Sequence, residues 1–160
     1  MNANIKVCFY TRSLHEKERI AQWLASTELI HCGIMISYDN LSVVLSSDKS
    51  HYAKFIDSNA FHSRVMEPKY VIDLGNKEIS LSQLERFMGS TYIGDGRSLG
   101  FWWFIGRHLL PNYHPKTCAL ITSQMLRICG YIVEDHICPH TLFKELENAN
   151  HNYRRTSWSR

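Results

Sequence analysis

The sequence has no long apolar segment, and this absence limits where the chain is expected to work. Its longest apolar run, residues 99–105, is interrupted by Gly100 and is too short to span a membrane. Residues 1–6 also lack the apolar stretch of a secretion signal. We therefore expect synthesis in a reducing cytoplasm, with neither a signal peptide nor a transmembrane segment.

Cysteine pairing, repeats and phosphate-binding motifs are also missing. The number of cysteines is odd and their spacing irregular, which argues against a disulfide framework. They are Cys8, Cys32, Cys118, Cys129 and Cys138. The chain has no internal repeat, no low-complexity tract and no glycine-rich loop of the kind that cradles phosphates. We expect no cofactor.

The bulk composition is that of one folded domain. The 160 residues are 44% hydrophobic and 21% charged, and the formal net charge is only +3, so disorder is not expected. We assign residues 1–150 to the domain and residues 151–160, with three arginines, to a basic tail. This tail either contacts an anionic partner, such as nucleic acid, membrane or cell-wall polymer, or is a solvated or partner-docked terminus.

Periodicity and turn residues predict an α+β fold. Short runs rich in β-branched and aromatic residues predict strands, two of them joined as a hairpin by the turn at 38–40. The predicted strands are residues 5–10, 29–37, 41–47 and 70–74. Residues 48–63 are polar with scattered aromatics and are predicted to form a loop.

Capping residues and helical spacing predict the helices. A Ser-x-x-Glu or Ser-x-x-Gln box precedes the first two, and Gly130 and Pro139 mark where the late helices end and begin. The predicted helices are residues 14–26, 81–88, 101–110, 118–129 and a last one from Pro139. The expected architecture is a small antiparallel sheet packed against the helix that begins at Cys118.

Cys118 is the best-placed candidate nucleophile. Thr117 is a predicted N-cap, so Cys118 lies in the first turn of its helix, where the dipole and free amides favour a thiolate. The same amides are suited to an oxyanion. The alternative is a small buried structural cysteine, which composition alone favours.

His31 opens a predicted strand and is the candidate base. A strand can hold an imidazole rigidly, and Gly33 removes a side chain two residues later, so that another element or a substrate can approach. The alternative is a structural histidine at a strand end, hydrogen-bonded to its surroundings.

Together these segments carry a family resemblance. His31-Cys32-Gly33-Ile34 resembles the His-x-Gly-Ile strand of the circularly permuted NlpC/P60 superfamily of papain-like cysteine hydrolases, which includes lecithin:retinol acyltransferase-like proteins. Residues 117–130 resemble that family's Cys-[Ser/Ala]-x-[Leu/Phe] helix, which ends in Leu-x-x-x-Gly. Pro139 and the leucines after it resemble its closing Pro-x-x-Leu segment. Phe9-Tyr10, followed by a helix and then the histidine strand, resembles the opening of phage-encoded members.

The resemblance implies an activity and roles for three residues. It implies hydrolysis of amide bonds in cell-wall peptides by a cysteine peptidase, with Cys118 as nucleophile and His31 as base; lipid acyl transfer is a neighbouring chemistry. In the family a polar residue on the next strand orients the imidazole. Ser42, Val44 and Ser46 share one face of that strand, and we select Ser46. Tyr10 either lines the pocket or is an ordinary half-buried strand tyrosine.

Other interpretations stay open beside this one. The chain is alternatively a phage virion component that keeps the fold with little or no activity and packs against other virion subunits. The aromatic residues 101–104 and the basic tail motivate this, because such a segment suits core or interface packing better than base stacking. Residues 136–140 contain two histidines and Cys138, but a zinc site needs more ligands than Cys129 adds, so no metal is expected.

Overall fold

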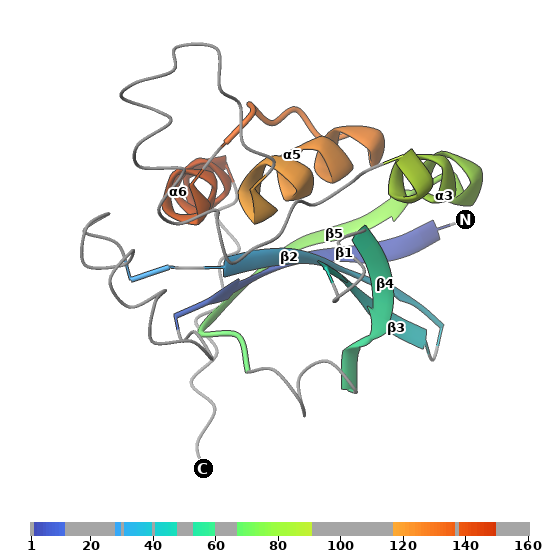
Figure 1. Cartoon of the computed structure of the whole chain (residues 1–160), viewed down its shortest axis with the longest axis horizontal. Coiled ribbons are helices and arrows are strands. Elements are labelled where there is room, and N and C mark those ends of the chain that lie inside the picture. The colour runs from blue at the N-terminus through green and yellow to red at the C-terminus, as the bar shows by residue number, and fades with distance from the viewer. Residues whose placement is uncertain are drawn as a thin grey trace.

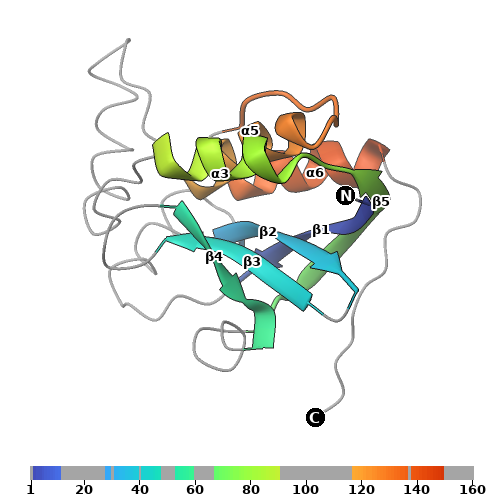
Figure 2. The same cartoon turned by 90° about the vertical axis from the view of Figure 1, so that its right-hand side faces the viewer.

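The computed structural model describes most of the predicted domain. The described residues are 2–11, 28–29, 31–39, 41–47, 53–59, 67–90, 117–136 and 138–149. They form a five-stranded antiparallel sheet with helices laid over one of its faces (Figures 1 and 2), which confirms the α+β class. The helices predicted at 14–26 and 101–110 and the basic tail lie outside the described residues.

The sheet has the strand order β4-β3-β2-β1-β5, with every neighbouring pair antiparallel. Four of the five strands lie where strands were predicted, at residues 5–10, 29–37, 41–47 and 70–74, and the first three along the chain pair with one another in chain order. The strands are β1 (Asn2–Tyr10), β2 (His31–Tyr38), β3 (Leu41–Ser47), β4 (Ala53–Asp57) and β5 (Tyr70–Glu78). β1 and β2 are inner strands, and they pair from Asn4 opposite Ser37 to Tyr10 opposite His31.

The three described helices begin and end close to where their capping residues predict. They are α3 (Leu81–Ser90), α5 (Cys118–Ile128) and α6 (Pro139–Ala149). At the start of α5, the Thr117 side-chain oxygen accepts a hydrogen bond from the Leu120 amide at 3.1 Å. Beyond its end, Gly130 adopts φ +81°, a left-handed conformation that glycine reaches without steric cost.

Both faces of the second half of β1 are buried, which explains the continuous apolar run at residues 7–10, whereas polar and apolar residues alternate in its first half. The larger core lies between the sheet and the helices, where Ile34 and Ile36 of β2 meet Met125 and Leu126 of α5. A smaller cluster occupies the opposite face; it contains Cys8, Tyr10 and Val44, with Met35, Ile56 and Val71 packed against it. Figure 1 shows α5 as the middle helix of the row, between α6 and α3.

The predicted loop at 48–63 is wrong where β4 forms. Residues Ala53–Asp57 pair with β3, with Phe55 opposite Leu45 and Ile56 opposite Val44. β4 is an edge strand, and edge strands generally contain charged residues; the sequence of β4 has two in five positions. That polar character hid the strand from a prediction based on apolar runs.

Gly33 accommodates a neighbouring strand. A Cβ atom at this position would lie 3.0 Å from the backbone carbonyl oxygen of Leu45 in β3 and 3.6 Å from a methyl group of Val44. The close approach expected at Gly33 is therefore that of β3, and the contact helps to set the spacing of the two strands.

We predict that Gly33→Ala destabilises the fold by about 1–3 kcal/mol, because the added methyl group meets a carbonyl oxygen fixed within the sheet. Urea unfolding followed by circular dichroism measures the loss. Glu78→Ala, at an exposed position of β5, is the control and should change stability by less than about 0.5 kcal/mol. Equal stability of the two variants would show that β3 shifts at no cost to make room for the added methyl group.

Candidate active site

Cys118 is the first residue of α5 and is half-buried. Because Thr117 is extended and caps the helix, the Leu120 amide bonds the Thr117 side chain and the Ile121 amide bonds the Thr117 carbonyl. Helix geometry leaves the amides of Cys118 and Ala119 without an intrahelical acceptor. The sulfur therefore lies at the positive end of the helix dipole.

His31 is the first residue of β2 and lies beside Tyr10. The two residues are paired across β1 and β2, and their ring centroids are 5.6 Å apart with the planes tilted by 38°. Tyr10 is buried, and burial, followed by the neighbouring Cys8, raises the pKa of its hydroxyl far above the usual range. Tyr10 is therefore an uncharged ring that packs beside the imidazole. It is buried rather than half-buried, and it contacts His31, which its interpretation as an ordinary strand tyrosine does not include.

Cys32 occupies the other face of the same strand. It is 2% exposed and belongs to the core beneath α5, with its Sγ 3.7 Å from the Thr122 hydroxyl oxygen. Cys118 and Thr122 are four residues apart on α5, so their side chains lie one above the other on the same helix face. This geometry brings the Cys32 sulfur under the Cys118 sulfur, and the two side chains form a hydrogen bond.

The Cys118 sulfur is the acceptor in this contact. A hydrogen bond from the Cys32 thiol, helped by the charge and a hydrogen bond of His31, holds the pKa of Cys118 well below its usual range, against the opposing effect of burial. Burial, reinforced by the hydrogen bond and charge of Cys118, raises the pKa of Cys32 well above its usual range. The opposite directions of the two pKa shifts favour the thiol form of Cys32 and the thiolate form of Cys118.

Two other cysteines show what burial does without such partners. Burial raises the pKa of Cys8 to about 12 and that of Cys129 to about 11. Raised pKa values favour the protonated thiol at neutral pH, the form in which buried structural cysteines are generally unreactive. The contrast singles out Cys118 among these positions as the reactive sulfur.

Ser46 is in β3, as predicted, but its side chain is outside the described part of the chain. Its backbone pairs with Lys54 of β4, and it lies two residues beyond Val44, which pairs with Met35. Its role as the residue that orients His31 stays a prediction.

The histidine near the start of α6 has a structural role. The His136 amide donates to the Ser123 hydroxyl at 3.4 Å, its Nδ1 lies 3.1 Å from the Thr141 hydroxyl, and its Nε2 contacts a carboxylate oxygen of Glu145. These contacts attach the connection between α5 and α6 to both helices. Within the described ranges, no three histidine, cysteine, aspartate or glutamate side chains gather in a way that could hold a metal ion.

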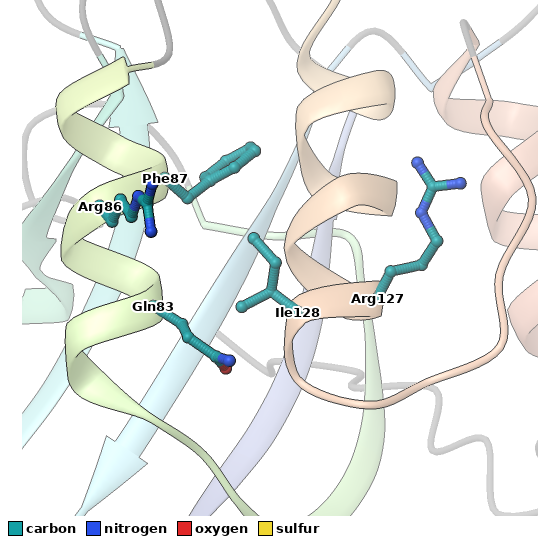
Figure 3. A pocket seen from close by; sticks show the side chains of 5 residues that line it. All are labelled: Gln83, Arg86, Phe87, Arg127 and Ile128. Carbon is teal, nitrogen blue, oxygen red and sulfur yellow. The ribbon is translucent and has the colours of Figure 1, made fainter.

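A separate hollow of about 410 Å³ lies between α3 and α5 (Figure 3). It is lined by Gln83, Arg86, Phe87, Arg127 and Ile128. Arg127 points away from α3 and pairs with Asp135, so its charge is already matched. The hollow is at the carboxyl end of α5, roughly 15 Å along the helix from Cys118, and contains no nucleophile.

Sequence reasoning paired Cys118 with His31 but missed Cys32. The available signal was position: a second cysteine next to the histidine, on the alternate face of a strand expected to lie under the Cys118 helix. No model of a known protein family matches the chain, and no curated protein is significantly similar to it. No helix within the described ranges is long and apolar enough to cross a membrane.

We predict that iodoacetamide labels Cys118 first at neutral pH. The thiolate is the reacting form, so a lowered pKa keeps labelling fast where an ordinary thiol is protonated, and labelling slows as pH falls through that pKa. Cys32→Ala removes a hydrogen bond to a charged sulfur and should raise the labelling midpoint by about 1–2 pH units. Peptide mass spectrometry across a pH series measures this.

The matched controls are Cys32→Ser and Cys129→Ala. Serine keeps a donor at position 32 and should restore part of the shift, whereas the loss of Cys129 should leave the midpoint unchanged. Uniform, slow labelling of all five cysteines would show that Cys118 is a structural thiol.

Proposed function

We propose that this chain is a cysteine hydrolase that cleaves amide bonds, with Cys118 as nucleophile and His31 as both the general acid and the general base. The observation that carries the proposal is the electrostatic difference between neighbouring sulfurs. Cys118 is held as a thiolate by Cys32 and His31 at a helix amino terminus, whereas burial keeps Cys32 protonated.

The arrangement of elements supports a permuted papain-like fold. A helix that begins with the nucleophile lies over the strand that begins with the histidine, and that strand belongs to an antiparallel sheet covered by helices on one face. The histidine strand precedes the cysteine helix in the chain, which is the permuted order. The resemblance of residues 31–34 and 117–130 to that superfamily agrees with this proposal.

The mechanism follows from the atoms around the sulfur. The Cys118 thiolate attacks the carbonyl carbon, and the Cys118 amide at the open end of α5 stabilises the oxyanion. His31, protonated beside the thiolate, gives its proton to the leaving amine. It then takes a proton from the water that hydrolyses the thioester, which restores the thiolate and the imidazolium. In this proposal Ser46 orients the His31 ring.

Peptidoglycan peptides are the proposed substrate class, and this step rests on the family resemblance alone. Lipid acyl transfer would use the same nucleophile and base with a different acyl donor. We further propose assembly into a phage virion, to which the resemblance to phage-encoded members points. A purely structural virion role is the second candidate, and the observation that favours it is that the hollow between α3 and α5 lies away from Cys118.

We predict that Cys118→Ala abolishes the release of free amino groups from purified peptidoglycan, because the covalent route is lost. His31→Ala should lower the rate by about 10²–10⁴-fold through loss of general acid–base catalysis. Both rates are measured by amine derivatisation, with circular dichroism to verify folding. Cys129→Ala is the matched control. It also removes a thiol, but at the opposite end of α5 from Cys118, and it should keep activity. Full activity of folded Cys118→Ala would refute the proposal.

A further inference from the structure

Two sulfurs from distant parts of the chain meet beneath the start of α5. Cys32 faces the helix from β2, and its Sγ contacts the Thr122 hydroxyl one helical turn after Cys118. Cys118 packs against the core cluster that contains Cys32. Residues four apart on a helix project from one face and tilt toward its amino terminus, so Thr122 directs Cys32 to the Cys118 sulfur.

The other cysteines are less well placed to pair with either sulfur. Cys8 belongs to the cluster on the opposite face of the sheet, and Cys129 follows the far end of α5. Cys138, which precedes α6, is the remaining competitor: it contributes to the raised pKa of Cys32 less than burial and the hydrogen bond with Cys118 do. All five are free thiols, so either pairing would be a new bond.

We propose that Cys118 is an oxidation site for peroxides and that Cys32 is its resolving thiol, so that the two close a reversible disulfide. The geometry that carries this is the placement of the buried Cys32 sulfur against the helix face that Cys118 and Thr122 share, with its Sγ 3.7 Å from the Thr122 hydroxyl oxygen. Cys118 itself is only partly buried, so a small oxidant can reach it. The inference goes beyond hydrolysis, because it requires only thiol chemistry. If the proposed hydrolase is active, the disulfide removes its nucleophile and switches it off.

The steps balance with hydrogen peroxide as the two-electron oxidant. The Cys118 thiolate attacks one peroxide oxygen; an S–O bond forms, the O–O bond breaks, and hydroxide leaves and is protonated to water. The Cys32 sulfur then attacks the Cys118 sulfenic acid, the S–S bond forms, the S–O bond breaks, and the Cys32 proton leaves with the hydroxyl group as a second water. Two thiols and one peroxide yield one disulfide and two waters, and an added dithiol reverses the reaction.

The bond would tie the start of α5 to the start of β2 across a long intervening segment. Closing a long loop in the unfolded chain stabilises the folded state, so the oxidised protein should melt about 5–10 °C higher than the reduced protein. This readout is independent of any enzymatic activity.

The test treats the full chain with stoichiometric hydrogen peroxide and follows intact mass. We expect a loss of about 2 Da that dithiothreitol reverses, and a proteolytic map that links Cys32 to Cys118. Cys32→Ser should instead accumulate a Cys118 sulfenic acid, about 16 Da heavier and trapped by dimedone. Cys118→Ser should not lose mass, and Cys138→Ser, the matched control, should behave as the wild type.

Three results would overturn the inference. They are a map that links Cys32 to Cys138, over-oxidation of Cys118 in the wild type while Cys32 stays reduced, and peroxide resistance of Cys118. The hydrolase is judged separately on peptidoglycan with reduced protein. If the disulfide forms but peptidoglycan is not hydrolysed, the disulfide inference stands and the hydrolase proposal is refuted. If peptidoglycan is hydrolysed but no disulfide forms, the hydrolase proposal stands and the disulfide inference is refuted.

Discussion

The contact between the amino terminus of α5 and the start of β2 is the constraint on which the site depends. Cys32, Ile34 and Ile36 form the face of β2 that supports the helix, and the buried side of α5 includes Ala119 and Thr122. Successive helical residues are turned by about 100° from one another, so a rotation of α5 by a single position would carry Cys118 away from Cys32. The packing of the apolar face of α5 on β2 therefore determines whether the Cys118 and Cys32 sulfurs lie close together.

The protonation of Cys118 results from two opposing effects of that position. Burial alone would raise its pKa, as it does for Cys8 and Cys129. A hydrogen bond to a charged group contributes about 1.5–3 kcal/mol, and Cys118 receives such bonds from both Cys32 and His31. Burial opposes the charged form at Cys118 as well, and the hydrogen bonds together with the charge of His31 outweigh it.

The sequence allowed the elements of the site to be predicted better than their contacts. Features that depend on neighbouring residues were predicted correctly. Thr117 and Gly130 mark the start and the end of α5, and the apolar runs in β1 and β2 mark inner strands. β4 was missed because an edge strand does not require a continuous apolar run. Cys32 was missed because its role depends on which face of β2 the helix covers, and that is a property of tertiary packing.

His31 and Cys32 are adjacent in a strand, and alternation gives their side chains opposite faces, yet both act on one sulfur. This is possible because His31 is the first residue of β2, and at the end of a strand a side chain can reach past the sheet. Farther inside the strand, the sheet itself would separate the imidazole from the thiolate.

The amide substrate of the proposed hydrolase and a peroxide would compete for the same electron pair on the Cys118 sulfur. The feature that activates the sulfur therefore also exposes it to inactivation. With Cys32 beneath it, that inactivation has a reversible end point in the proposed disulfide.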